Sequence, residues 1–329
     1  MQRTESTEAA GAKVLGTGVA ILIPCYNEEL TVGNVVNQFR SQLPGAEIYV
    51  FDNDSTDETA REALRAGALV LHEKRRGKGY VVQSMFHQVE AETYVMVDGD
   101  DTYPPESVQK LIEPIQKNYA DMVVGSRLHD HSHSEFKRLN RLGNRVFLSA
   151  LNLVFRVKLT DMLSGYRAFN RKFVKEIAPF AGGFEIETEL TIKALEGGYR
   201  IVEVPIDLTS RPEGSHSKIR LLHDGAIILN TIVTLFRDYK PLTFFGSAGL
   251  VLIAAAFIPG TIVILEFIET GLVLHLPSAV LAVGLVLSGM LSTAVGLTLH
   301  TIVRRFQELD YRLRILTEEL RSRRSEDKN

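Results

Sequence analysis

Two long stretches without any Asp, Glu, Lys or Arg constrain the fold of this chain most strongly. The first runs from Leu242 to Leu265 and the second from Gly271 to Val303. Each exceeds the ~20 residues that a helix needs to cross the hydrocarbon core of a bilayer. Helices buried in a soluble core are the alternative, but soluble helices of this length normally keep a polar face. The sequence therefore predicts a hairpin of two membrane-spanning helices joined by Glu266–Thr270.

Charges around this hairpin predict its orientation. The connecting loop carries only Glu266 and Glu269, whereas the outer ends are basic, with Arg237, Lys240, Arg304, Arg305, Arg312 and Arg314. By the positive-inside rule, the N-terminal domain and the C-terminal tail are cytoplasmic, in a multi-pass protein of the cell (inner) membrane. Met1–Thr17 has no apolar core of a signal peptide. The single cysteine, Cys25, excludes an internal disulfide framework and agrees with a reducing compartment.

The segments beside the hairpin leave several alternatives open. Residues 219–236 are apolar with interspersed polar residues, which fits either an interfacial helix or a packed helix of the soluble domain. The tail carries leucines at heptad-like spacing, which fits a homo-oligomer, packing on the cytoplasmic domain or contact with anionic lipid. Those leucines are Leu309, Leu313, Leu316 and Leu320. The expected organisation is a flexible N-terminus (1–17), a soluble domain (18–218), juxtamembrane helices (219–240), two membrane helices (241–303) and a C-terminal helix (304–329).

The soluble domain alternates short apolar runs with helical patterns. The expected strands are Gly18–Asn27, Ala46–Asp54, Ala68–Glu73, Thr93–Asp100 and Asp121–Arg127. Most are apolar on both faces, which predicts an α/β fold with a mainly parallel sheet covered by helices on both sides. Ligands of such sheets bind beyond the carboxyl ends of the strands. The formal net charge of −3 gives no reason to expect nucleic-acid binding.

Polar residues cluster at the predicted carboxyl ends of four strands. The clusters are Cys25–Glu29, Asp52–Asp57, Asp98–Asp101 and Gly125–Arg127. One such cluster alone is more often a helix N-cap. Four clusters at one edge of a sheet predict a ligand site.

The third cluster has the chemistry of a cation site. Asp98 and Asp100 are separated only by Gly99 and follow an apolar strand. Two carboxylates at this spacing can hold Mg²⁺ or Mn²⁺ through oxygen ligands, with phosphate oxygens of a substrate completing the shell. The metal would neutralise a diphosphate leaving group.

A nucleotide bound beside that metal would need a pocket for its base and ribose. Asp52 can accept a hydrogen bond from an imide N–H or a ribose hydroxyl, and Tyr26 and Glu28 can complete the pocket. Tyr26 has a packed aromatic side chain as its alternative. Arg76 and Lys78 lie in a glycine-containing segment without the spacing of a P-loop, but both can touch a phosphate.

Further basic residues are expected in loops of the soluble domain. Each can be an ordinary surface charge, but together, next to a membrane hairpin, they suit an acceptor that carries a phosphate. The set comprises Arg127, Arg138, Arg141, Arg211 and Lys218.

Five motifs taken in order resemble glycosyltransferase family 2. They are ILIPCYNEE, DNDSTDET, VDGDDTYPPE, VGSR and LSGYRAF. Their order and spacing are similar to those of polyprenyl-phosphate glycosyltransferases, the group that contains dolichyl-phosphate mannose synthases and the GtrB-type enzymes. The resemblance covers about residues 18–218, and the two C-terminal spans match the GtrB-type architecture.

The resemblance implies a Rossmann-like GT-A fold and metal-dependent, inverting transfer of a hexose from a nucleoside diphosphate sugar to a polyprenyl phosphate. It favours UDP-glucose and undecaprenyl phosphate, with GDP-mannose as the alternative donor. Thr102 stands where relatives often have a metal-binding Gln, and Asp161 lies in the stretch near the acceptor. The matching positions are Pro24, Tyr26, Glu28 and Asp52 for the nucleotide, Asp98 and Asp100 for the metal, and Arg127 and Arg211 for phosphates.

The mechanism follows from the ionisation of the acceptor. A phosphate monoester has a second pKa of about 6, so it is largely dianionic at pH 7 and needs no strong general base. The site must instead hold two anionic substrates together for in-line attack on the anomeric carbon. Asp161 either orients the acceptor or acts as a base.

Two rival functions remain. A processive polysaccharide synthase normally has more spans and a tryptophan-bearing motif, whereas this chain has no tryptophan. A non-catalytic membrane scaffold would not need the acidic pair, which is present.

Overall fold

The computed structural model describes residues 18–127, 148–149, 152, 157–209 and 221–326. The chain divides into two compact units, Met1–Ile232 and Val233–Asn329. Each unit is described by itself.

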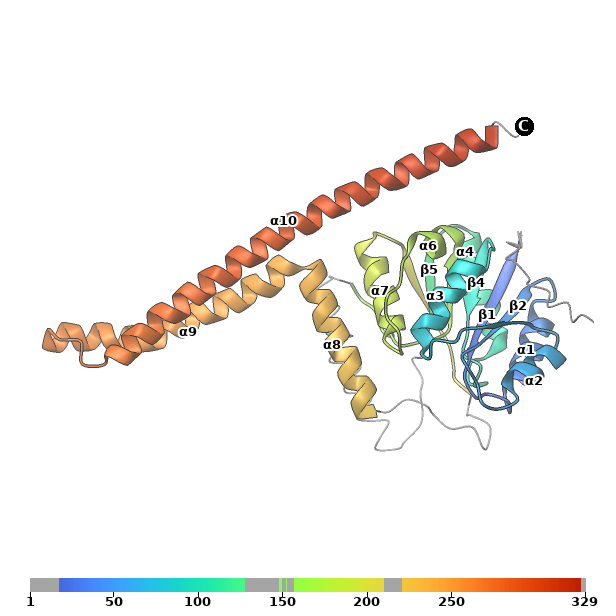
Figure 1. The fold of residues 1–329 in the computed structure, drawn as a ribbon, viewed down its shortest axis with the longest axis horizontal. Helices are drawn as coiled ribbons and strands as arrows, with labels where there is room; N and C mark the ends of the chain where they lie inside the picture. Colours follow the sequence, from blue (N-terminus) through green and yellow to red (C-terminus); the bar gives the residue numbers. More distant parts are fainter. Residues whose placement is uncertain (1–17, 128–147, 150–151, 153–156, 210–220, 327–329) are drawn as a thin grey trace, which may run out of the picture. The chain divides into compact units, whose positions relative to one another are not determined.

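The first unit is built on a seven-stranded sheet in the order β3-β2-β1-β4-β6-β5-β7 (Figure 1). The short strand β6 runs antiparallel to both of its neighbours, β4 and β5, and the other pairings are parallel. This confirms the predicted α/β fold with a mainly parallel sheet. The strands are β1 (Val19–Cys25), β2 (Glu47–Asp52), β3 (Leu69–His72), β4 (Thr93–Met96), β5 (Met122–Ser126), β6 (Arg167–Asn170) and β7 (Ile201–Pro205).

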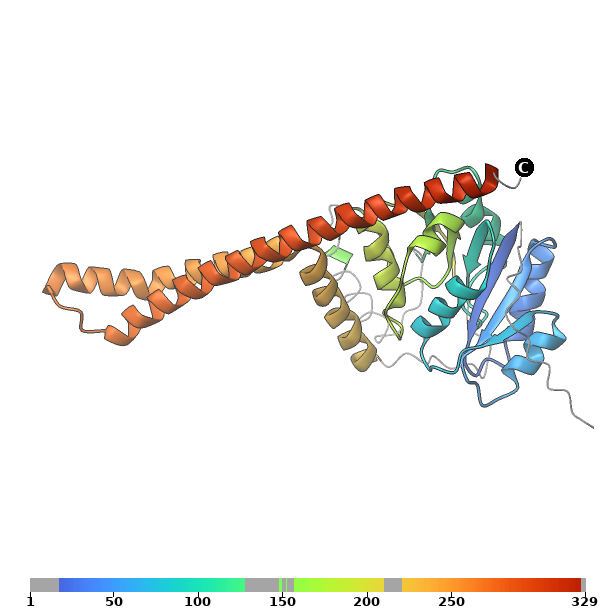
Figure 2. The ribbon, with the colours of Figure 1, turned by 45° about the horizontal axis from the view of Figure 1, so that its top comes forward.

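Helices cover both faces of this sheet (Figures 1 and 2). Alternating residues of each central strand enter two separate apolar clusters, so that Ile21 and Ile23 pack into one and Leu22 into the other. Burial on both faces is the reason that the strand sequences are almost continuously apolar. One face carries α1 (Val32–Gln42), α2 (Thr59–Arg65) and α4 (Val108–Gln116), preceded by the 3₁₀ turn Pro105–Ser107; the other carries α3 (Lys78–Gln88), α6 (Arg171–Glu176) and α7 (Ile186–Glu196).

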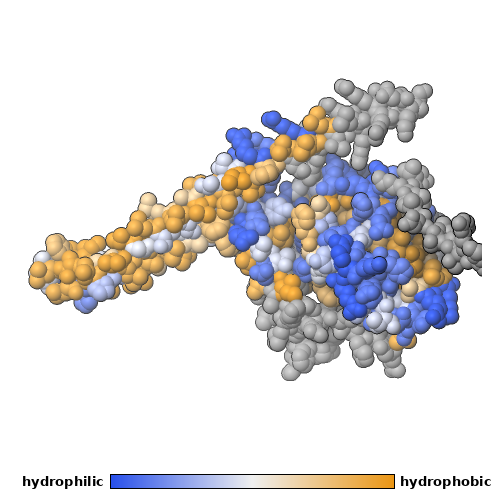
Figure 3. Space-filling view, in the orientation of Figure 1, coloured by the Kyte–Doolittle hydropathy of each residue, from blue (hydrophilic) through white to orange (hydrophobic). Residues whose placement is uncertain are grey.

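The second unit is dominated by two long helices, α9 (Pro241–Thr270) and α10 (Leu276–Glu326), which follow α8 (Leu221–Tyr239). All of α9 and residues 276–309 of α10 are long and apolar enough to cross a membrane. Most of their large apolar side chains are exposed, and Figure 3 shows apolar residues along both helices. The helix α10 continues without a break through the range in which we expected a second span and a separate tail.

Close approach of glycines packs α9 against α10. A Cβ atom at Gly249 would lie 2.6 Å from the carbonyl oxygen of Gly289, and one at Gly289 would lie 2.7 Å from the carbonyl oxygen of Gly249. Beside this contact, Ser292 Oγ donates a hydrogen bond of 2.8 Å to the carbonyl of Phe245. Small residues that let two backbones approach are typical of helix pairs in membranes.

Candidate active site

The carboxyl ends of β1, β2, β4 and β5 lie at one edge of the sheet, which brings the four predicted polar clusters together. The loops after β1 and β2 bind each other directly. The amide of Asn27 donates to Ser55 Oγ (3.0 Å), and the Asn27 side chain accepts from the amide of Thr56 (2.8 Å). The amide of Glu28 donates to Thr59 Oγ1 (2.7 Å). These reciprocal bonds hold both loops in one conformation.

Unusual backbone conformations concentrate at this edge. Asn27, Asp54 and Asp101 have φ of 52°, 58° and 58°, and among the described residues the fourth non-glycine residue with positive φ is Asn118. Asn and Asp tolerate this region better than other residues, but it still costs free energy. Such conformations gather where a site requires them, so they mark this edge independently of the motifs.

Asp52 ends β2 and is almost fully buried. Its Oδ2 atom lies 3.2 Å from His72 Nδ1 and accepts from the amide of Ser55 at 3.4 Å. Its Oδ1 atom is buried and has no hydrogen-bond partner among the described residues. An orphaned acceptor of this kind suits a ligand that brings an N–H or O–H group.

The other residues predicted to bind the nucleotide lie on β1, in the loop after it and in the segment before α3. Pro24 lies in β1 one register step before the pair Cys25–Asp52. The guanidinium of Arg76 lies 5.4 Å from the ring centroid of Tyr26 and pairs with Asp54. Glu28 begins the turn that leads into α1, where its carbonyl accepts from the amide of Val32 (2.9 Å).

Lys78 is the first residue of α3 and is positioned by contacts on both sides of it. The Asn53 side chain donates to the carbonyl of Arg75 and accepts from the amide of Gly77, both at 2.7 Å. A Cβ atom at Gly79 would lie only 2.0 Å from the carbonyl oxygen of Ala181. A side chain at Gly79, in the first turn of α3, would therefore push this helix away from Ala181 and move Lys78.

Lys78 lies between two carboxylates. Its Nζ atom is 2.5 Å from Asp98 Oδ1 and 2.6 Å from Glu187 Oε1. Although burial alone would lower the pKa of Lys78, the carboxylates of Asp98 and Glu187 raise it well above its ordinary value. Glu187, in the first turn of α7, escaped the sequence analysis.

The acidic pair lies just beyond β4. The Asp98 carboxylate packs closely against Gly165, since a Cβ atom there would lie 2.5 Å from Asp98 Oδ2. Gly99 is held by Thr31, whose hydroxyl donates to its carbonyl (2.7 Å). Asp100 is buried and accepts a hydrogen bond of 2.6 Å from Thr102 Oγ1.

These residues fit a hard divalent cation. The side chains of Asp98 and Asp100 supply oxygen atoms only, and the ammonium of Lys78 already marks Asp98 as a position that attracts positive charge. No group of three or more His, Cys, Asp and Glu side chains suited to a metal occurs among the described residues. Phosphate oxygens of a bound substrate would add to these two carboxylates.

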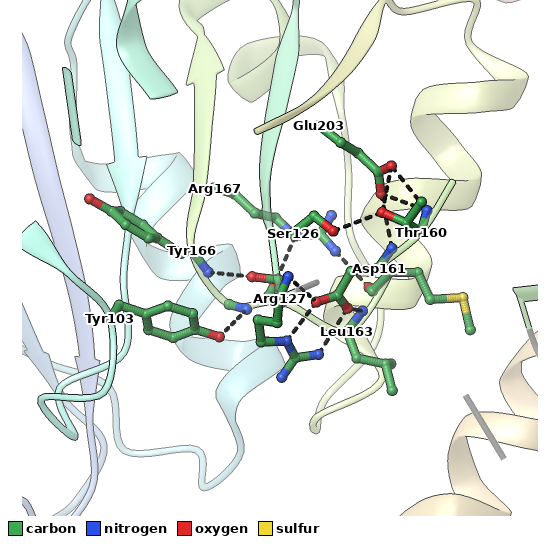
Figure 4. Close-up of polar contacts among 12 residues, drawn as sticks. Tyr103, Ser126, Arg127, Thr160, Asp161, Leu163, Tyr166, Arg167 and Glu203 are labelled. Carbon is green, nitrogen blue, oxygen red and sulfur yellow. Dashed lines mark hydrogen bonds and ion pairs between the residues drawn. The ribbon is translucent and has the colours of Figure 1, made fainter. Parts of the chain in front are cut away.

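Arg127 and Asp161 form a two-pronged ion pair at the end of β5 (Figure 4). Arg127 Nε donates to Asp161 Oδ2 (2.6 Å), and Nη2 donates to Oδ1 (2.8 Å). Asp161 also accepts from the amides of Arg127 (3.2 Å) and Leu163 (3.0 Å). Burial alone would raise the pKa of Asp161, but the Arg127 guanidinium holds it below its usual range. The carboxylate is thus ionised, with both oxygens engaged.

A buried arginine, Arg167, supports the turn that follows Asp161. It has no exposed surface and donates to the carbonyls of Ser164 (2.8 Å) and Met162 (2.7 Å) and to Thr191 Oγ1 (2.9 Å). Burial lowers its pKa. Arg167 lies within the LSGYRAF motif, where nothing in the sequence indicates this supporting role.

Tyr103 connects the two halves of the site. Its hydroxyl accepts a hydrogen bond of 2.9 Å from the amide of Gly165. Burial raises the pKa of its phenol, and the charges of Arg127, Asp98 and Lys78 act on it in opposite directions. The phenol of Tyr103 therefore lies within electrostatic range of three groups predicted for separate roles. Arg138, Arg141, Arg211 and Lys218 lie outside the described residues.

Comparisons with known proteins identify relatives of this chain. Residues 20–178 match the model of glycosyl transferase family 2. The glycosyltransferase AglJ of Haloferax volcanii is 32% identical over 300 residues, which cover 89% of this chain and 98% of the relative. A dolichyl-phosphate hexose transferase of the same organism is 30% identical over 65% of this chain and 92% of its own. A dolichol-phosphate mannosyltransferase of Pyrococcus furiosus is 29% identical over 61% of this chain and 59% of its own.

Solved structures share the fold of the first unit. The glucosyl-3-phosphoglycerate synthase of Mycobacterium tuberculosis, in complex with Mn²⁺, UDP-glucose and phosphoglyceric acid, superposes with a TM-score of 0.54 at 25% identity. The match covers 67% of this chain and 79% of the synthase. A complex of the same enzyme with Mg²⁺ and UDP gives a TM-score of 0.55 at 25% identity, with the same coverage of both chains.

Proposed function

The chain belongs to glycosyltransferase family 2, and on that premise we propose that it transfers a hexose from a nucleoside diphosphate sugar to the phosphate of a polyprenyl phosphate. The observation that carries the proposal is the edge of the sheet where an acidic pair lies beside two ion-paired cations, Lys78 and Arg127. This arrangement suits two anionic substrates held together. Relatives named for dolichyl-phosphate transfer support the choice of acceptor.

The donor we propose is UDP-glucose. The buried Oδ1 atom of Asp52 would accept from the imide N–H of the uracil ring, while Tyr26, Glu28 and Pro24 line the nucleotide. The solved synthase that binds UDP-glucose supports this choice, whereas the mannosyltransferase relative favours GDP-mannose as the second candidate. Both donors enter the test below.

The donor half of the site works mainly through charge. Asp98 and Asp100 would hold Mg²⁺ or Mn²⁺, which when bound neutralises the diphosphate leaving group. Lys78 supplies a further positive charge beside Asp98 and can contact a phosphate oxygen without losing its anchor on Glu187. The loops after β1 and β2 hold the nucleotide in a fixed orientation for in-line displacement at the anomeric carbon.

The acceptor half of the site orients an anion rather than removing a proton. Both oxygens of Asp161 are engaged and its pKa is lowered, so it is a poor general base. Arg127 uses Nε and Nη2 for Asp161, which leaves its Nη1 edge for a phosphate. The acceptor phosphate brings its own nucleophilic oxygen, because it is largely dianionic at neutral pH. We assign Asp161 the role of orienting Arg127.

The second unit would supply the membrane anchor. We propose that α9 and the apolar part of α10 cross the cell membrane as a hairpin, with the catalytic domain and both termini in the cytoplasm. The basic residues at the outer ends of the hairpin support this orientation. A lipid-linked acceptor would then share the membrane with its enzyme.

The test is product formation by the full-length protein in detergent. Undecaprenyl or dolichyl phosphate is offered with radiolabelled UDP-glucose or GDP-mannose, in the presence of Mg²⁺, Mn²⁺ or EDTA. Label that moves into an organic-soluble, acid-labile product with UDP-glucose, and is lost with EDTA or in Asp100→Asn, is the expected result. Transfer from GDP-mannose but not from UDP-glucose would show that GDP-mannose is the donor. Nucleotide binding without any transfer to lipid would refute the acceptor.

A further inference from the structure

Glu203 lies on the edge strand β7, away from every motif identified in the sequence, yet it contacts the loop that carries Asp161 (Figure 4). Its Oε1 atom accepts from the amides of Thr160 and Asp161, both at 2.9 Å. Its Oε2 atom accepts from the amide of Thr160 (3.0 Å) and from Thr160 Oγ1 (2.9 Å). One carboxylate therefore collects three donors from two consecutive residues.

The position of Glu203 follows from the sheet. β7 pairs in parallel with β5, so that Glu203 lies opposite Val124 and Pro205 lies opposite Ser126, the residue before Arg127. Ser126 Oγ in turn lies 2.7 Å from Thr160 Oγ1. The loop at Thr160 is thus attached to both strands next to the point where Arg127 leaves β5.

We propose that Glu203 is a positioning residue for the acceptor phosphate, acting on Arg127 through Thr160 and Asp161. The amide of Asp161 donates a hydrogen bond to Glu203, and the Asp161 carboxylate accepts two hydrogen bonds from the Arg127 guanidinium. A shift of the loop therefore moves the guanidinium directly. This inference rests on the proposed function, because it assumes that Arg127 meets the acceptor.

The alternative role is a purely structural one, in which Glu203 stabilises the loop without affecting substrates. The two roles differ in their kinetic signature. Loss of a structural contact lowers stability and affects both substrates alike. If Glu203 positions Arg127, its loss weakens binding of the acceptor but not of the donor. The loss then has no further effect in a variant in which Arg127 can no longer form its bidentate pair with Asp161.

The experiment uses the full-length protein in detergent with the donor that the wild type accepts. KM for undecaprenyl phosphate and for the donor, kcat and the thermal midpoint are measured for Glu203→Ala, Glu203→Gln, Arg127→Lys and both double variants. Glu203→Gln keeps an acceptor oxygen but replaces the other oxygen by an amide that only donates, so it should retain part of the effect. Binding of farnesyl phosphate in the presence of UDP is measured by calorimetry as a readout without turnover.

Glu90→Gln is the matched control. Glu90 is a buried carboxylate that pairs with Arg171 and Lys175. It lies just before the amino end of β4, whereas the candidate site lies at the carboxyl ends of the parallel strands. Its substitution removes a buried ion pair without approaching Arg127. We expect it to lower the thermal midpoint and to leave both KM values unchanged.

For Glu203→Ala we expect KM for the acceptor to rise about tenfold to a hundredfold, with donor KM within about twofold of wild type. Binding of farnesyl phosphate should weaken in parallel. The acceptor KM of Glu203→Gln should lie between those of the wild type and Glu203→Ala. In the Arg127→Lys background, Glu203→Ala should raise the acceptor KM little further. An equal rise of KM for both substrates would overturn the inference. So would an effect of Glu203→Ala on the acceptor KM that is as large in the Arg127→Lys background as in the wild type. A wild type that neither binds nor glycosylates a polyprenyl phosphate would instead refute the proposed function. If the alanine variant does not fold, the same criteria apply to Glu203→Gln.

Discussion

Replacing Gly165 by alanine tests whether Asp98, whose carboxylate packs against this glycine, is a ligand of a cation. The backbone of Gly165 does not have positive φ, so alanine brings no conformational penalty there. Its Cβ atom, however, would lie 2.5 Å from Asp98 Oδ2 and 2.9 Å from Asp98 Cγ. A carboxylate oxygen in van der Waals contact with carbon needs on the order of 0.5–1 Å more. The Asp98 side chain must therefore turn away.

The magnitude follows from the tolerance of metal coordination. Metal–oxygen distances are held within roughly ±0.2 Å, so the expected displacement is several times larger than a site accepts. We expect Mn²⁺ to bind about 10–100-fold more weakly in the presence of UDP, the range typical of changes beside a metal ligand. The free energy of unfolding should fall by only about 1 kcal/mol, because a side chain rather than the backbone moves.

The assay is Mn²⁺ titration of the full-length protein with UDP, followed by electron paramagnetic resonance, with thermal unfolding measured in parallel. Gly45→Ala is the matched control, because a Cβ atom at Gly45 meets no atom within 4 Å. Unchanged Mn²⁺ affinity in Gly165→Ala at an unchanged thermal midpoint would show that Asp98 does not ligate the metal. An equal loss in both variants would point to a general effect of the substitutions.

Two further predictions concern acid stability and the hairpin. The pKa of Glu73 is lowered to about 2, first by hydrogen bonds from Arg75, so its contribution to stability is present above the ordinary value of about 4.3 and is lost as the pH falls toward 2. Thermal midpoints between pH 5 and pH 2 should therefore fall more steeply for the wild type than for Glu73→Gln, and parallel curves would contradict this. Gly289→Leu should destabilise the α9–α10 pair by about 1–3 kcal/mol, because a Cβ atom there would lie 2.6 Å from Ile253. Gly284→Leu on the same helix, where a Cβ atom meets nothing within 4 Å, should have little effect on the thermal midpoint in detergent, and equal effects of the two would refute the close packing.

Of the five strands predicted from the sequence, β1, β2, β4 and β5 were recognisable because they are buried on both faces and therefore almost continuously apolar. The fifth, β3, is partly exposed, and only its short apolar run marked it. β6 lacks this signal. It is only four residues long, begins with Arg167, and lies between β4 and β5 although it follows both in the chain. Its place in the sheet depends on long-range pairing, which no local pattern reports. The edge of the sheet that carries the site was predictable because parallel strands end on the same side.

The polar partners of the predicted site residues were not predictable. Glu185, Glu187 and Glu189 alternate at the start of α7, and nothing in their spacing indicates that Glu187 is the one that meets Lys78. Glu203 stands between two valines in a strand, a pattern that favours a solvated side chain. Its contact with Thr160 arises only once β7 lies beside β5. Both carboxylates act on residues far away in the chain.

The interlocked loops after β1 and β2 also have a consequence for the entropy of binding. Ordering a backbone costs roughly 1–2 kcal/mol per residue, and a loop that folds around its ligand pays this from the binding free energy. Here Asn27, Ser55 and Thr56 order each other through their own hydrogen bonds before any ligand arrives. In the proposed donor site, the affinity for the donor would therefore be determined by contacts with the nucleotide rather than by loop folding. A substitution that loosens either loop would then weaken donor binding even where it removes no contact with the donor.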